Sequence, residues 1–127
     1  MSQIKFTETH EWLRIEDDDT GTIGITDYAQ NALGDLVFIG LPKVGQEMAQ
    51  GSEGAIIESV KAAAEIHMPV AGTVIAINES LADDPAQVNS DPLGAGWFIR
   101  IKLADPAQAD ALLDQAAYDQ FVASLDS

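Results

Sequence analysis

The chain has 127 residues, a length that predicts one domain over residues 1–127 around a single hydrophobic core. It carries 21 acidic against 6 basic side chains, a formal net charge of −15, which makes nucleic acid and anionic membrane poor partners. It contains no cysteine and no apolar run of membrane-spanning length, so disulfides, thiolate metal sites, a thiol nucleophile and a membrane helix are excluded.

The first third of the chain predicts short strands around one helix. Glu16–Gly21 is acidic and glycine-ended, which indicates a solvated turn, and it lacks the alternating ligand spacing of a calcium loop. Thr26 or Asp27 can cap a short helix over Asp27–Leu33, and Gly34 occupies the position where a left-handed residue ends a helix. The strands expected in this part are Glu11–Ile15, Thr22–Ile25 and Leu36–Ile39.

Lys61 lies between two short apolar runs of equal length, Gly54–Val60 and Ala64–Val70. Both runs are bounded by glycine or proline, so we expect paired strands with Lys61 at the exposed tip of a hairpin. An amine on a long carbon stem, held at such a point, suits covalent loading by a modifying enzyme. The sequence has only three other lysines, which are Lys5, Lys43 and Lys102.

The region after the hairpin predicts two more strands separated by a loop. Gly72–Ile77 is the first strand, and Asn78–Pro92 is expected to be mostly loop with one helical turn near Pro85–Val88. Trp97–Leu103 alternates as a strand with one wet face would. Its inward side chains would be Ile99, Ile101 and Leu103, and its outward ones Phe98, Arg100 and Lys102.

A helical segment over about residues 105–125 should close the chain. Asp105 can cap it, Pro106 fits the first helical position, and Ala107–Leu113 follows. A second helical piece, Gln115–Leu125, would pack one face at four-residue spacing. That face consists of Ala117, Phe121 and Leu125. The fold class expected from all elements is mainly β with peripheral helices, a compact sandwich or flattened barrel.

The motif around Lys61, Glu58-Ser-Val-Lys-Ala62 followed by Pro69-Val-Ala-Gly72, resembles the hairpin of lipoyl and biotinyl carriers. Further motifs span about Phe6 to Leu103: His10-Glu-Trp12, Gly24-Ile-Thr-Asp-Tyr-Ala-Gln30, Leu33-Gly-Asp-Leu-Val-Phe38, Leu41-Pro42, Asn78, Leu81, Val88-Asn89, Asp91-Pro92 and Gly96-Trp97. With these motifs the chain resembles the H-protein family of the glycine cleavage system. The resemblance implies a barrel-sandwich hybrid fold and a monomer.

The same resemblance implies a non-catalytic carrier with lipoate bound to Lys61 as an amide. A lipoate ligase or lipoyl transferase would attach it. The arm would take the aminomethyl group of glycine from a pyridoxal-phosphate-dependent glycine decarboxylase to a tetrahydrofolate-dependent aminomethyltransferase. A dihydrolipoamide dehydrogenase would then reoxidise it. The start of the chain has no targeting character, which favours a cytoplasmic location, or a mitochondrial matrix one if a presequence has been removed.

A loaded arm of this family would fold into a cleft on its own protein. Its cationic ammonium would be stabilised by a nearby carboxylate in a partly dry site. Our candidates for that cleft are Thr9, Glu11 and Glu65. With two histidines and no cysteine, we expect no metal site.

Three other functions stay open at this point. A lipoyl-relay protein would hand lipoate to 2-oxoacid dehydrogenases and take no part in glycine cleavage. A biotin carrier usually has methionine on both sides of its lysine, whereas Val60 and Ala62 flank Lys61 here. An unmodified interaction module with an acidic surface is the third.

Overall fold

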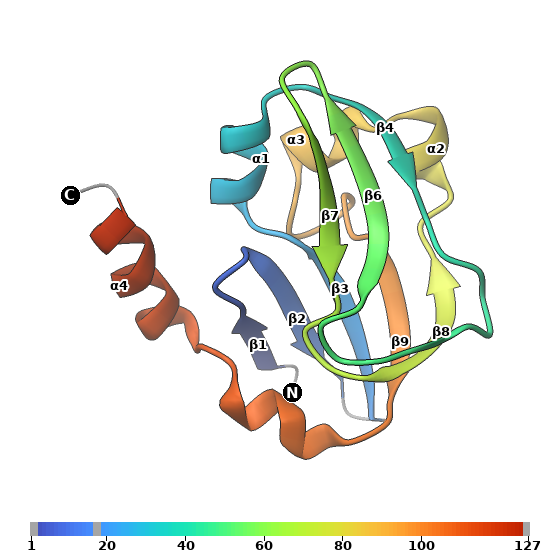
Figure 1. Ribbon diagram of the computed structural model, residues 1–127, viewed down its shortest axis with the longest axis vertical. Coiled ribbons are helices and arrows are strands. Elements are labelled where there is room, and N and C mark those ends of the chain that lie inside the picture. Colours follow the sequence, from blue (N-terminus) through green and yellow to red (C-terminus); the bar gives the residue numbers. More distant parts are fainter. Residues whose placement is uncertain (1–2, 17–18, 126–127) are drawn as a thin grey trace.

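The computed structural model describes residues 3–16 and 19–125, and the chain forms two antiparallel sheets (Figure 1). The six-stranded sheet has the order β1-β2-β3-β9-β8-β5, and the three-stranded sheet has the order β4-β6-β7. The strands of the larger sheet are β1 Gln3–Phe6, β2 Glu11–Ile15, β3 Thr20–Ile25, β5 Glu47–Met48, β8 Gly72–Ile77 and β9 Ile99–Leu103. Those of the smaller sheet are β4 Leu36–Gly40, β6 Glu53–Ser59 and β7 Ala63–His67.

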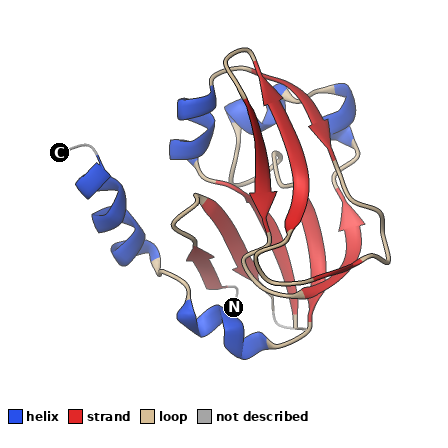
Figure 2. Cartoon of the chain, viewed as in Figure 1, coloured by secondary structure: helices blue, strands red, loops and turns tan. Residues whose placement is uncertain are grey.

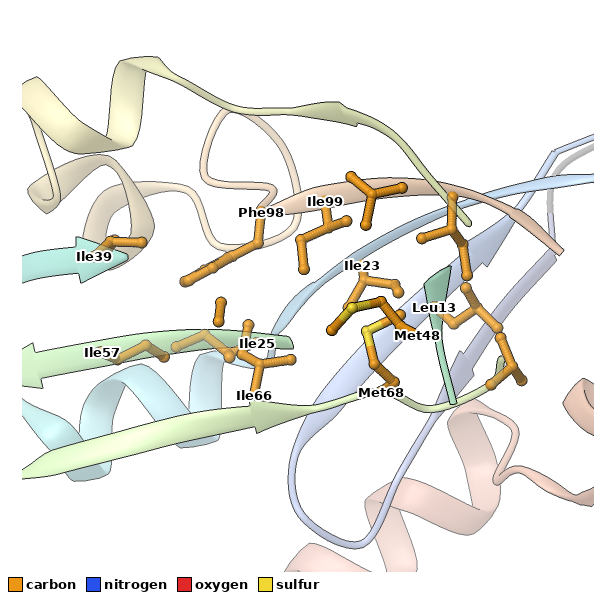
Figure 3. Close-up of a cluster of buried hydrophobic side chains, with 14 of the residues drawn as sticks. Leu13, Ile23, Ile25, Ile39, Met48, Ile57, Ile66, Met68, Phe98 and Ile99 are labelled. Carbon is orange, nitrogen blue, oxygen red and sulfur yellow. The ribbon is translucent and has the colours of Figure 1, made fainter. Parts of the chain in front are cut away.

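The core lies between the two sheets (Figure 3). Ile99 from the larger sheet and Ile57 and Ile66 from the smaller sheet are almost completely buried there. Each such side chain contributes roughly 1.5–3 kcal/mol by leaving water, so this shared core is the main reason that the two sheets stay together. An open sandwich of this kind confirms the expected fold class.

Phe98 corrects the predicted wet face of the last strand. Its ring is completely buried, because β9 begins only at Ile99 and Phe98 belongs to the preceding loop rather than to the strand's alternation. Within β9 the alternation holds, since Ile99 and Ile101 are buried while Lys102 is exposed.

In the described part of the chain, four α-helices and one 3-10 helix cover the ends and one side of the sandwich (Figure 2). Their bounds are α1 Asp27–Leu33, α2 Ser80–Asp83, α3 Ala86–Ser90, the 3-10 helix Pro106–Ala111 and α4 Gln115–Leu125. In Figure 1 the β6–β7 turn lies at the same end of the molecule as α1, α2 and α3. The region after β8 holds two short helices, α2 and α3, whereas the sequence predicted only one helical turn near Pro85–Val88. The buried side chains Leu81 and Val88 anchor one helix each.

Local capping explains where two of these helices begin and end. The Thr26 hydroxyl accepts a hydrogen bond from the Ala29 amide (3.3 Å) and starts α1. Gly34 ends α1 with φ of 79°, a conformation that favours glycine. Asp105 accepts from the Ala107 amide (3.1 Å), as predicted, although the helix that follows is 3-10 and ends at Ala111.

Helix α4 packs on β1 through Tyr118, which is buried and stacks on Phe6 with ring centroids 4.6 Å apart. The predicted face of Ala117, Phe121 and Leu125 holds only in part. Phe121 is half-buried and packs on the same cluster, whereas Leu125 is exposed and the buried residue of the helix is Tyr118. The strand β1, which α4 covers, was not predicted, and neither was β5.

The acidic turn predicted over residues 16–21 falls partly on residues 17–18, which lie outside the described part, and Thr20 already belongs to β3. Among the described residues, no helix is both long enough and apolar enough to cross a membrane.

Candidate functional site

Lys61 lies in the turn that joins β6 to β7, and its side chain is exposed. The last strand pair is Glu58 with Ala63, so the turn runs from Ser59, the last residue of β6, to Ala62. Ser59 closes it from within: its amide donates to the Ala62 carbonyl (2.8 Å), and its hydroxyl oxygen accepts from the amides of Lys61 (3.2 Å) and Ala62 (3.1 Å). The predicted hairpin with Lys61 at its tip is confirmed, and the serine hydroxyl gives the turn a fixed shape.

The connection between α1 and β4 supports this turn from outside. The Val60 amide donates to the Asp35 carbonyl (3.0 Å), one residue before Lys61. The carbon stem of Lys61 lies over Gly34, where an added Cβ would be 3.3 Å from the lysine Cε. The tip is thus bonded within the hairpin and also to a separate part of the fold, so the amine starts from a defined place.

Two of the three predicted cleft residues lie together. The Glu11 side chain is 2% exposed, and its Oε1 accepts from the hydroxyls of Thr7 and Thr9 at 2.5 Å each. Its Oε2 accepts from the backbone amide of His67 (3.3 Å), at the end of β7. Thr7 was not predicted as part of this site. Its hydroxyl also accepts a hydrogen bond from the backbone amide of Glu11 (3.0 Å), four residues later in the chain. These donors leave the carboxylate buried but well satisfied.

Glu65 interacts with other groups than that pair does. It is exposed on the outer face of β7, whereas its neighbour Ile66 faces the core. The Glu53 carboxylate raises the pKa of Glu65, first through a hydrogen bond and then through like charge, while His67 acts in the opposite direction. The groups that act on Glu65 are therefore those of the outer sheet face, and Thr9 and Glu11 are not among them.

His10, directly before Glu11, connects this region to the C-terminal helix. It adopts φ of 70°, which is rare for a residue other than glycine, and its carbonyl accepts from the Thr26 amide (2.9 Å). Its Nδ1 lies 2.8 Å from the Tyr118 hydroxyl, which also lies 2.7 Å from the Thr26 hydroxyl. Burial lowers the pKa of His10, and the Glu11 carboxylate opposes that shift. Sequence reasoning missed this role because Tyr118 is more than a hundred residues away.

Trp12 completes the motif as a structural residue. Its ring is completely buried, and its Nε1 donates to the Pro92 carbonyl (2.9 Å). The Arg14 guanidinium lies over the ring, 4.8 Å from its centroid. Trp12 is therefore a buried packing residue, and its ring does not line an open site.

Comparisons with known proteins match this fold and sequence along nearly the whole chain. The family model described as "Glycine cleavage H-protein" matches residues 4–125. This chain belongs to the glycine cleavage H-protein family. A glycine cleavage system H protein of Rhodospirillum rubrum is 55% identical over 126 residues, which cover 99% of this chain and 100% of the relative. Glycine cleavage system H protein 1 of Pseudomonas aeruginosa is 57% identical over 122 residues, 96% of this chain and 95% of the relative.

A solved H-protein structure extends the match to three dimensions. The crystal structure of a glycine cleavage system H protein from Mycobacterium marinum has a TM-score of 0.86 at 31% identity and covers 98% of both chains. In this member of the H-protein family, the exposed feature with reactive chemistry at the tip is the primary amine of Lys61. An amine of this kind can be acylated by an activated donor, and the Lys61 side chain is exposed.

Proposed function

We propose that this chain is the lipoyl carrier of a glycine cleavage system, with lipoate attached to Lys61 Nζ as an amide. The observation that carries the proposal is the exposed lysine at the tip of a turn fixed by Ser59 and Asp35, in a chain of the H-protein family. Such a site fits the group, because the stem lies on the bare backbone of Gly34 and the side chain is exposed to a modifying enzyme. When attached, the dithiolane supplies sulfur redox chemistry to a chain that has no cysteine.

In this proposal the protein contributes a tether and no catalytic group. It would carry the aminomethyl group of glycine from a pyridoxal-phosphate-dependent glycine decarboxylase to a tetrahydrofolate-dependent aminomethyltransferase. Reoxidation would fall to dihydrolipoamide dehydrogenase, and attachment to a lipoate ligase or lipoyl transferase. Holding the cargo on one chain keeps it at high effective concentration near each active site. The relatives reported above come from bacteria, which supports a cytoplasmic place of action.

Thr9, Glu11 and Glu65 are the residues we propose for holding the loaded arm. Glu11 is supported by its burial beside two hydroxyls, since a carboxylate in a partly dry site attracts a cationic ammonium more strongly than one in water. Glu65 would act from the outer face of β7, four residues after Lys61. The two roles separate experimentally: Glu11→Gln should speed hydrolytic loss of the aminomethyl group from the loaded protein more than Glu65→Gln does.

Intact mass spectrometry tests the attachment. The purified chain is incubated with a lipoate ligase, lipoate and ATP, and we expect it to gain the mass of one lipoyl amide. Lys61→Arg should abolish the gain, while Lys43→Arg, which changes another exposed lysine, should keep it. If the parent stays unmodified while the same ligase modifies a known acceptor, the remaining function is that of an unmodified interaction module with an acidic surface.

Glycine–bicarbonate exchange tests the role in glycine cleavage. The lipoylated chain should support exchange of bicarbonate into glycine by a glycine decarboxylase, and the Lys61→Arg variant should not. A lipoylated chain that supports no exchange but donates lipoate to 2-oxoacid dehydrogenases would instead be a relay protein.

A further inference from the structure

The side chain of Asn89, in α3, makes three hydrogen bonds that all leave its own helix. Its Nδ2 donates to the Gly34 carbonyl (2.9 Å) and to the Gln30 side-chain oxygen (2.9 Å). Its Oδ1 accepts from the Leu36 amide (3.0 Å). One amide group therefore binds the backbone on both sides of Asp35, at the end of α1 and at the start of β4.

The segment that Asn89 holds is the one that supports the lysine turn. Asp35 lies between the two backbone groups bound by Asn89, and its carbonyl accepts from the Val60 amide (3.0 Å). The stem of Lys61 lies over Gly34 in the same segment. Asn89 is thus connected to Val60, the residue before Lys61, through two hydrogen bonds and the backbone of Asp35. None of its three side-chain bonds goes to the lysine or to its turn.

This segment needs such a restraint. Gly34 has φ of 79° and, without a side chain, can leave that conformation more easily than any other residue type. A register irregularity follows directly, between Leu36 and Phe38, so the start of β4 is less regularly paired than a continuous ladder. With its Gly34 and Leu36 groups unbound, the segment would move, and the carbonyl of Asp35 would move with it.

We propose that Asn89 is a positioning residue for Lys61: through the α1–β4 connection it keeps the turn in the one orientation in which the amine is presented for acylation. The inference rests on the proposed attachment of lipoate at this lysine. Asn89 does not take part in the acylation itself, because its amide is occupied by Gln30, Gly34 and Leu36.

Asn78 offers a matched control. It is also a poorly exposed asparagine whose side chain makes three hydrogen bonds. Its Nδ2 donates to the carbonyls of Ala95 (2.8 Å) and Trp97 (2.8 Å), and its Oδ1 accepts from the Ser80 hydroxyl (2.7 Å). None of these partners belongs to the α1–β4 connection or to the lysine turn. Asn78→Ala therefore removes a comparable set of bonds without touching the support of Lys61.

The experiment compares the parent with Asn89→Ala, Asn89→Asp and Asn78→Ala in two measurements. Amide hydrogen exchange of Val60 is followed by NMR in the unmodified full-length proteins. Steady-state lipoylation is followed with a purified lipoate ligase, lipoate and ATP, with each protein as the varied acceptor. Asn89→Asp has the same shape as asparagine and keeps the acceptor for Leu36 while it loses both donors, so it serves if the alanine variant does not fold.

We expect the Val60 amide to exchange nearly as fast as an unprotected amide in both Asn89 variants, and at least about tenfold more slowly in Asn78→Ala, because local opening exposes the amide without global unfolding. The apparent KM of the acceptor should rise by about tenfold with kcat nearly unchanged, because KM scales inversely with the fraction of molecules in the competent state. Equal Val60 exchange and equal KM in the Asn89 and Asn78 variants would overturn the inference. A parent that takes no lipoate overturns the proposed function instead, and that outcome is distinguishable because Val60 exchange needs no ligase.

Discussion

The carboxylate of Glu11, at the start of β2, accepts a hydrogen bond from the backbone amide of His67, at the end of β7 (3.3 Å). Strand β7 is at the edge of the three-stranded sheet and β2 belongs to the six-stranded sheet, so one side chain joins the two sheets outside their common core. Thr7 and Thr9 hold the same carboxylate from the β1–β2 loop.

Glu11→Ala should lower the free energy of unfolding by about 1–3 kcal/mol, because the His67 amide and two hydroxyls lose their acceptor in a buried place. Urea denaturation followed by circular dichroism measures this loss. Glu8→Ala, at an exposed position of the same loop, is the control and should change little. Equal effects of the two substitutions would show that the Glu11 carboxylate does not stabilise the junction.

Gly24→Ala should also be destabilising, by about 1–3 kcal/mol, because a Cβ at this position would lie 2.7 Å from the Trp12 ring. The ring would have to move and would weaken its hydrogen bond to the Pro92 carbonyl. Urea unfolding followed by tryptophan fluorescence reports both the stability and the ring's surroundings. Gly40→Ala, where the nearest atom to a Cβ is a Phe38 ring carbon at 3.4 Å, should be tolerated; a Gly24 variant as stable as the Gly40 variant would refute the packing account.

The half-buried position of His10 predicts a pH effect on stability. Burial lowers the pKa of His10 in the folded protein, so the unfolded chain binds the proton more readily. The stabilisation by neutral His10 is present above the unfolded pKa of about 6.5 and is lost as the pH falls from there toward the lowered folded value.

The variant His10→Asn isolates this effect, since asparagine tolerates the positive φ of 70°. Urea midpoints measured between pH 7.5 and pH 5.5, about one unit on either side of the histidine reference value, should fall more in the parent than in the variant. Many carboxylates also titrate toward acid pH, but they are common to both proteins and cancel in the difference. Parallel curves would mean that the proton on His10 does not affect folding.

The contacts of Tyr118 should hold α4 against the rest of the fold. Tyr118→Ala removes the stack on Phe6 and the hydroxyl that lies near His10 and Thr26, a change of the kind that costs about 3 kcal/mol or more. We expect chymotrypsin to cleave α4 at Phe121 much faster in this variant. Tyr118→Phe keeps the ring and should be cleaved at an intermediate rate, whereas cleavage of all three proteins at the parental rate would contradict the anchoring role.

Features set by neighbouring residues could be predicted from the sequence, and those set by distant contacts could not. The cap at Thr26, the stop at Gly34 and the hairpin around Lys61 depend on a few adjacent residues, and the structure has all three. Tyr118 became the buried residue of α4 because Phe6, from the other end of the chain, lies opposite it. No period within the helix could indicate that partner.

The candidate site divides in the same way. Lys61 can be proposed from its own surroundings in the sequence, and Thr9 and Glu11 are close in sequence as well as in space. Glu65 is four residues from Lys61, yet strand alternation places it on the outer face of β7, where Glu53 acts on it. The support of the turn by Asp35 and Asn89 depends on pairings between separate elements, which a single sequence does not reveal.

The absence of a side chain at position 34 serves two separate purposes. It permits the positive φ that ends α1, and it leaves the space that the stem of Lys61 occupies. A Cβ at this position would press on Cε and Cδ, the last carbons of the lysine stem, so a glycine in another element sets the direction in which a carried group leaves the turn. Helix termination and the course of the arm can therefore change only together.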